Sequence, residues 1–186
     1  MNIKNLLVLG ILTITLLTGC GDKSDDISDS IVDTKEEIQQ LPTFNLKTTM
    51  GKPVTIEVTK DGWIFKEYPN KVVLLNFFAT WCPPCKAEIP HLNNLMEKYK
   101  DEFVTIAILV EKDKTNNEIS NFIKQYNIQY PVTNSSENFD LADAVGGVSS
   151  IPAMFMFNKQ GLVVKDYVGA IQEEILDSDI KKVLGK

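Results

Sequence analysis

Two cysteines, Cys82 and Cys85, stand three positions apart directly after an apolar segment. Such a pair can form a redox centre, half of a metal site or a structural disulfide. A disulfide across so short a loop is a poor structural crosslink, because its gain in stability grows with loop length. A structural zinc site takes four ligands, and the chain has a single histidine, His91. The spacing therefore favours a redox pair.

The flanking residues are expected to place Cys82 at the start of a helix. Residues 72–79 are almost wholly apolar, which is typical of a central strand buried on both faces. Pro83 suits the first helical position, where its missing N–H costs nothing. Beyond it, apolar residues recur at three- and four-residue steps, which predicts an amphipathic helix. The helix N-terminus would lower the pKa of Cys82 and favour an exposed thiolate, with Cys85 one turn further in.

The remaining pattern is that of an α/β domain. Residues 54–58 and 63–65 flank Asp61-Gly62, which predicts a β-hairpin. The elements expected after the cysteine helix are a strand at 103–110, a helix at 116–126, an antiparallel strand pair at 153–157 and 162–168, and a helix at 171–184. This order predicts a central mixed sheet with helices on both faces and an N-terminal β-hairpin extension.

The first residues carry an export pattern instead. Lys4 and the apolar run 6–17 are typical of a secretory signal, which is too short to span a bilayer as a mature helix. Residues 17–20, Leu-Thr-Gly-Cys, resemble the lipobox of bacterial lipoproteins. Residues 1–19 are thus expected to be a lipoprotein signal peptide and Cys20 a lipidation site; the alternative is an ordinary signal peptide followed by a free thiol. Acyl chains on Cys20 would hold the protein on a bacterial membrane, facing the periplasm or the cell exterior.

Charge divides the rest of the chain into two parts. Residues 21–40 hold seven acidic residues and two lysines, and such a polar, like-charged stretch is expected to be an extended linker. Residues 41–186 are long enough for one domain with a sizeable core, and they hold 16 lysines and 18 acidic residues. The chain contains no arginine and no basic cluster, so no nucleic-acid partner is expected.

The run 73–85, Val-Leu-Leu-Asn-Phe-Phe-Ala-Thr-Trp-Cys-Pro-Pro-Cys, resembles the active-site strand of the thioredoxin superfamily. More narrowly, it is similar to the exported TlpA/ResA-like thiol–disulfide oxidoreductases. Residues 148–155 resemble the family's cis-proline loop and the strand that follows it. The resemblance spans about residues 41–185. It implies a thioredoxin-like fold whose redox group is the Cys82–Cys85 disulfide, without metal or other cofactor.

The resemblance also implies roles for individual residues. In the family the first cysteine attacks the substrate and the second resolves the mixed disulfide, and these roles fall on Cys82 and Cys85. The cis-proline falls on Pro152, beside which Ile151 would offer its backbone to an extended substrate. The expected substrate-binding residues are Trp81, Pro83, Pro84, Ile151 and Pro152.

Two positions concern the proton of the resolving thiol. Thioredoxin has a buried aspartate where this chain has Asn76, and an amide cannot titrate. TlpA/ResA-like members often carry a glutamate three residues after the second cysteine, and Glu88 matches it. One turn from Cys85, Glu88 lies on nearly the same helix face and is placed to exchange that proton. The alternative is a solvated helix carboxylate.

These patterns, taken with the resemblance, predict a lipid-anchored thiol–disulfide reductase. The resemblance implies that its substrates are disulfides of exported proteins, such as apocytochromes c or metal-site assembly proteins. Its expected partners are these substrates and a membrane electron donor of thiol–disulfide type, and the protein itself is expected to be a monomer. The same fold also hosts thiol oxidants and isomerases. Two further alternatives are a peroxidase, which the paired motif disfavours, and a metal or haem chaperone that uses Cys82, Cys85 and His91.

Overall fold

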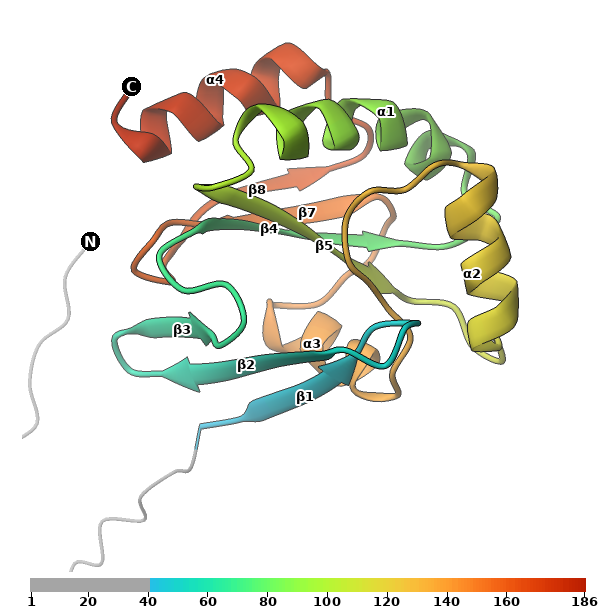
Figure 1. The fold of residues 1–186 in the computed structure, drawn as a ribbon. Coiled ribbons are helices and arrows are strands. Elements are labelled where there is room, and N and C mark those ends of the chain that lie inside the picture. The colour runs from blue at the N-terminus through green and yellow to red at the C-terminus, as the bar shows by residue number, and fades with distance from the viewer. Residues whose placement is uncertain (1–40) are drawn as a thin grey trace, which may run out of the picture. The chain divides into compact units, whose positions relative to one another are not determined.

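The structure, a computed structural model, describes residues 41–186. The predicted signal peptide, Cys20 and the acidic linker lie outside this range. Within residues 41–186 the elements are, in order, β1 (Thr43–Lys47), β2 (Pro53–Thr59), β3 (Gly62–Phe65), β4 (Val72–Phe78), α1 (Pro83–Lys98), β5 (Phe103–Leu109), α2 (Asn116–Gln125), β6 (Val132–Thr133), α3 (Glu137–Ala144), β7 (Ala153–Phe157), β8 (Val163–Val168) and α4 (Glu173–Leu184) (Figure 1).

The central sheet has the strand order β6-β5-β4-β7-β8. Strand β4 runs parallel to β5 and antiparallel to β7, so the sheet is mixed. Every residue of β4 and β5 is buried, as their apolar sequences predict for central strands. The register pairs Phe78 with Leu109. Because β4 and β5 are parallel and end together, the segments that follow them lie side by side at one edge of the sheet.

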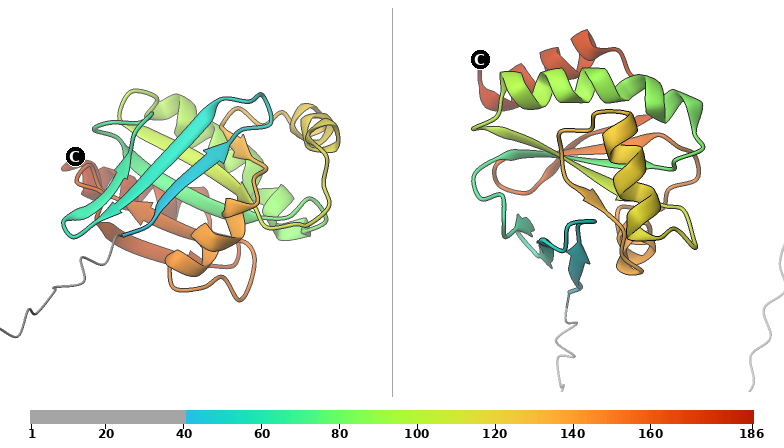
Figure 2. Two further views of the ribbon diagram at one scale, coloured as in Figure 1. Left: turned by 90° about the horizontal axis from the view of Figure 1, so that it is seen from below. Right: turned by 45° about the vertical axis from the view of Figure 1, so that its right-hand side comes forward.

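Helices cover both faces of this sheet. Helices α1 and α4 lie over one face, and α3 lies with the sheet β1-β2-β3 over the other (Figures 1 and 2). The side chains of β4 alternate between the two core layers, Val72, Leu74 and Phe78 facing α1, and Val73, Leu75 and Phe77 facing the small sheet. Residues Ile119 and Phe122 of α2 belong to the α1 layer. The predicted thioredoxin-like α/β fold is therefore confirmed.

Three elements were not predicted from the sequence. The N-terminal extension is a three-stranded sheet, because β1 pairs with β2 of the expected hairpin. Strand β6 has only two residues, which is too short to show a periodicity. Helix α3 buries only Asn138, Leu141 and Ala142, so it lacks the apolar stripe by which a helix is recognised.

An aromatic cluster joins the small sheet to the central one. The ring of Trp63 on β3 lies 6.3 Å from that of Phe44 and 5.2 Å from that of Phe157, measured between centroids. The Phe65 ring meets the same Phe157 ring edge-on at 5.1 Å. Since such aromatic pairs stabilise beyond their buried area, this cluster fixes the small sheet against β7.

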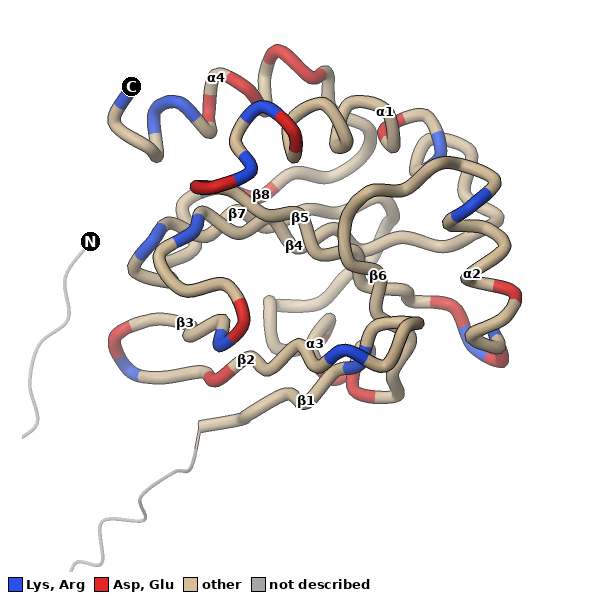
Figure 3. The backbone as a smooth tube through the Cα atoms, in the orientation of Figure 1, with Lys and Arg blue, Asp and Glu red and all other residues tan. Residues whose placement is uncertain are grey.

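Charged residues of both signs are interspersed along α4 and along the segment between β5 and α2 (Figure 3). On α4, Asp177 pairs with Lys98 of α1 at 2.6 Å and with Lys181 at 2.8 Å.

Among residues 41–186, none of the helices combines the length and the apolar character that crossing a membrane requires.

Candidate active site

Cys82 and Cys85 form a disulfide at the start of α1, with a Cα–Cα distance of 5.3 Å. Cys82 is the N-cap of this helix, and its Sγ accepts a hydrogen bond from the backbone N–H of Cys85 at 3.3 Å. Pro83 occupies the first helical turn, as predicted. The pair therefore sits at a helix N-terminus, where the unpaired N–H groups and the dipole stabilise a thiolate.

Both cysteines are buried in this oxidised form, Cys82 being 2% exposed and Cys85 4%. In the disulfide, the Cys82 sulfur is bonded to Cys85 and accepts an N–H from the first helical turn. The expected exposure of the Cys82 thiolate concerns the reduced form and stays a prediction. The preceding residue, Trp81, is 64% exposed, so its indole does not pack into the core.

Glu88 lies one turn beyond Cys85 and is only 2% exposed. Its Oε1 accepts a hydrogen bond from the backbone N–H of Ile171 at 2.7 Å, whereas its Oε2 has no hydrogen-bond partner among residues 41–186. Burial raises the pKa of Glu88 to about 7, against the opposing effects of the Ile171 N–H and of His91. The alternative of a solvated carboxylate is wrong, because this group is buried and titrates near neutral pH.

Two further polar side chains lie in the same layer of the core. Asn76, on the α1 side of β4, is buried, and its Oδ1 has no partner within the described residues. Tyr130, which the sequence did not single out, is buried, and its pKa lies above its usual value because of burial and, second, the charge of Glu88. The charge of Glu88 is thus felt by the Tyr130 phenol, and the Glu88 carboxyl feels His91 in turn.

His91 contacts Glu173 at the start of α4. Its Nδ1 lies 3.0 Å from Oε2 of Glu173, which also accepts a hydrogen bond from Asn94 Nδ2 at 3.0 Å. This contact joins α1 to the start of α4 and lowers the pKa of Glu173. No group of three or more His, Cys, Asp and Glu side chains in residues 41–186 is arranged to hold a metal.

The loop before β7 brings the predicted substrate-binding residues together in part. The Ile151–Pro152 peptide bond is cis, as the family resemblance implied. Ile151 and Trp81 line one open groove of about 390 Å³, together with Phe139 of α3 and Val148. Pro83 and Pro84 are exposed on the first turn of α1 and do not line this groove. The roles of these residues in binding stay predictions.

A carboxylate that sequence reasoning missed holds the segment in front of the disulfide. Glu111, just after β5, accepts two hydrogen bonds at Oε2 from Thr80, one from its backbone N–H at 2.8 Å and one from its hydroxyl at 2.7 Å. The two residues are 31 positions apart. Only the register of β4 and β5, which end at the same edge of the sheet, could have predicted that they meet.

Comparison with known proteins agrees with this geometry. The sequence pattern of the Redoxin family matches residues 36–184. The thiol-disulfide oxidoreductase ResA of Bacillus cereus is 30% identical over 186 residues, covering 97% of this chain and 98% of its own. ResA of Bacillus subtilis is 31% identical over 153 residues, covering 81% and 79%. A thiol:disulfide interchange protein of Chlorobium tepidum superposes with a TM-score of 0.62 at 29% identity, covering 78% of this chain and 96% of its own.

Proposed function

We propose, on the premise that this chain belongs to the Redoxin family and is a thiol–disulfide oxidoreductase of the ResA type, that it reduces disulfides of exported proteins. The observation that carries the proposal is the Cys82–Cys85 pair at the N-terminus of α1 with the buried Glu88 one turn behind it. Apocytochromes c and metal-site assembly proteins are the proposed substrate classes, because the resemblance points to them.

The reaction follows from the two thiols in sequence. The Cys82 thiolate attacks one sulfur of a substrate disulfide, which forms a mixed disulfide and releases the other sulfur as a thiolate. Cys85 then loses its proton to Glu88 and attacks the Cys82 sulfur, which closes the Cys82–Cys85 disulfide and releases the second substrate thiolate. The substrate gains two electrons and the protein loses two. A dithiol donor at the membrane returns the pair to the reduced form.

The groove beside the disulfide supports a protein substrate. An extended chain can pair with the backbone of Ile151, while Trp81 and Phe139 offer apolar surface to a side chain next to the substrate cysteine. We propose that substrates carry an apolar residue near the cysteine that Cys82 attacks.

The location is proposed from the lipobox-like run that ends at Cys20. Cys20→Ser should remain uncleaved at this position and take up no labelled fatty acid, whereas the unaltered chain should be labelled. Fatty acid that still enters Cys20→Ser would contradict lipidation at this residue.

Trapping of partners tests the roles of the two thiols. Cys85→Ser should accumulate mixed disulfides with its substrates, because it can attack but not resolve, and Cys82→Ser should accumulate none. Mass spectrometry of the adducts names the substrates. Equal trapping by both variants would contradict these roles.

The reduction potential of the pair tests the direction of the reaction. A reductase should have a potential near that of thioredoxin, about −270 mV, and an oxidant one near that of DsbA, about −120 mV. We expect equilibration with defined glutathione or dithiothreitol buffers to place the Cys82–Cys85 couple toward the thioredoxin end.

A further inference from the structure

The segment that carries Trp81 and Cys82 packs into the core through Ala79 and Cys82 but has few hydrogen bonds of its own. It leaves the sheet at Phe78, and within it the backbone N–H of Cys82 donates to the carbonyl of Ala79 at 3.2 Å. Trp81 is exposed and anchors nothing in the core. Among residues 41–186, the side chain that holds this segment by hydrogen bonds from another element is Glu111, which accepts two from Thr80.

The sheet places Glu111 opposite Thr80. Beyond the paired residues Phe78 and Leu109, the backbone N–H of Val110 still donates to the carbonyl of Phe78 at 2.9 Å. The ladder thus continues to the point where the two chains part. The Glu111 side chain is only 13% exposed, so water competes little for its oxygen, and hydrogen bonds to a carboxylate are stronger than those to a neutral acceptor.

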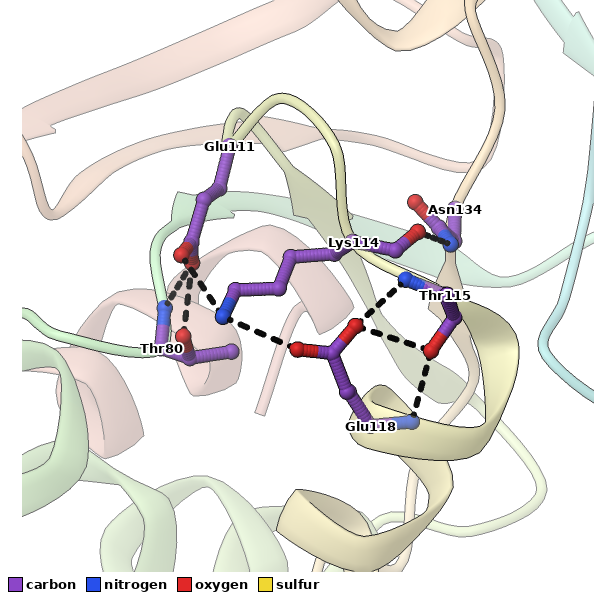
Figure 4. A network of polar contacts seen from close by, with 6 residues as sticks. All are labelled: Thr80, Glu111, Lys114, Thr115, Glu118 and Asn134. Carbon is purple, nitrogen blue, oxygen red and sulfur yellow. Dashed lines mark hydrogen bonds and ion pairs between the residues drawn. The ribbon is translucent and has the colours of Figure 1, made fainter.

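A chain of contacts holds Glu111 in turn (Figure 4). Its Oε1 lies 3.5 Å from Lys114 Nζ, and the same ammonium lies 3.4 Å from Oε1 of Glu118. Glu118 closes a capping box at the start of α2, where its Oε2 accepts from the backbone N–H of Thr115 at 2.9 Å and Thr115 Oγ1 accepts from the Glu118 N–H at 3.2 Å. The orientation of Glu111 is thus tied to the N-terminus of α2.

We propose that Glu111 is a positioning residue of the dithiol reaction, which fixes Thr80 and thereby holds Cys82 where an incoming disulfide meets its sulfur. It touches neither thiol, and it acts through the two hydrogen bonds from Thr80. The proposal rests on the proposed function in one respect, namely that Cys82 is the attacking thiol. Cys85, inside α1, is held by the helix, and it attacks a sulfur at the N-cap of that same helix, so its own step should depend less on Glu111.

The test measures the two steps separately in the reduced, full-length protein, with a disulfide-bonded peptide as the probe and stopped-flow detection. Glu111→Ala should slow the attack by about tenfold, because small misplacements of reacting groups are costly in rate, and slow the resolving step less, because that step joins two residues of one helix terminus. Glu111→Gln keeps an oxygen that accepts both hydrogen bonds and should restore most of the rate. The matched control is Glu102→Ala, which removes an ion-paired carboxylate at the opposite end of β5 and should change neither step.

Thr80→Val removes only the hydroxyl donor and should slow the attack by about twofold; it carries the test alone if Glu111→Ala does not fold. An attack rate in Thr80→Val or in folded Glu111→Ala equal to that of the unaltered protein overturns the proposal. A Glu111→Gln variant as slow as Glu111→Ala also overturns it, since geometry would then not be the cause. If the unaltered protein fails to react with the peptide, the proposed function fails, and this inference fails with it.

Discussion

Glu88 is a carboxyl group that the fold has removed from water without giving it a full set of partners. One oxygen accepts the N–H of Ile171, and the other has no partner among the described residues. A buried carboxyl favours its neutral form, which is why its pKa rises to about 7. A group that titrates near the working pH is the most effective proton carrier, and Asn76 cannot take its place.

The first prediction concerns the step that needs this proton carrier. Glu88→Gln keeps the shape and loses the titration, so the attack of Cys85 on the mixed disulfide should slow by about 100-fold near neutral pH, the low end for a positioned acid or base. The initial attack by Cys82 should change little. Glu97→Gln, on the exposed face of the same helix, is the control. A resolving rate and pH profile equal to those of the unaltered protein would show that Glu88 has no part in the step.

The second prediction is the effect of the same group on folding stability. The pKa of Glu88 rises on folding from 4.5 to about 7, so the folded state binds more protons than the unfolded state between these values. Stability should therefore fall as pH rises from about 4.5 to about 7, by at most about 3 kcal/mol. Denaturant unfolding of the oxidised protein and of Glu88→Gln across this range measures the difference. Parallel curves for the two proteins would contradict the raised pKa.

At the scale of elements, the start of α1 depends on Cys82 as its N-cap. The third prediction compares Cys82→Ser with Cys82→Ala, both of which lack the disulfide and the attacking thiol. Serine accepts the N–H of Cys85 and alanine cannot, so the serine variant should be more stable by about 1 kcal/mol. The free energies of unfolding, measured under reducing conditions, give the value. Equal stabilities would show that the cap contributes nothing.

Local patterns were sufficient to predict most of the fold. The apolar strand β4, Pro83 and the stripe of α1 are signals contained within single segments, and so they located the cysteine pair correctly. Strand β1 also carried a signal, since Phe44 and Leu46 alternate with exposed residues. Strand β6 and helix α3 carried none, because their places depend on the sheet to which they pack.

The residues alone predicted the site only where it is local, because the cysteines lie at the start of one helix. The family resemblance singled out Glu88 on that helix and the distant Pro152, whose peptide bond is cis. The burial of Glu88 could not be predicted, since its carboxylate meets the backbone N–H of Ile171, 83 positions further along the chain. The contact between Thr80 and Glu111 likewise requires the register of β4 and β5.

At the scale of the whole molecule, strand β8 lies at the edge of the central sheet, where a second copy of the protein could pair with it. Val163, Val164 and Val168 are exposed on it, and an exposed apolar edge invites pairing with another chain. Its middle residues are Lys165 and Asp166. If two copies of β8 paired antiparallel about a two-fold axis through Lys165 or Asp166, that residue would lie opposite itself in the other copy. Like charges directly opposite each other are destabilising, so we expect a monomer.

The fourth prediction follows from this arrangement. Replacing both Lys165 and Asp166 by Val should make the protein associate at micromolar concentrations, as measured by sedimentation velocity. The control replaces Glu174 and Lys182, two exposed charges on α4, by Val and should remain monomeric. An unaltered protein that already dimerises would show that the charges of β8 do not prevent association.

The exposed indole of Trp81 has a further consequence for how this protein can be observed. A disulfide quenches the fluorescence of an adjacent excited indole, and Trp81 directly precedes Cys82. The other tryptophan, Trp63, lies in the aromatic cluster of the small sheet. In Trp63→Phe, therefore, all tryptophan emission comes from beside the redox pair. We expect that emission to brighten on reduction and to dim with each turnover, so that the protein reports its own oxidation state without a label.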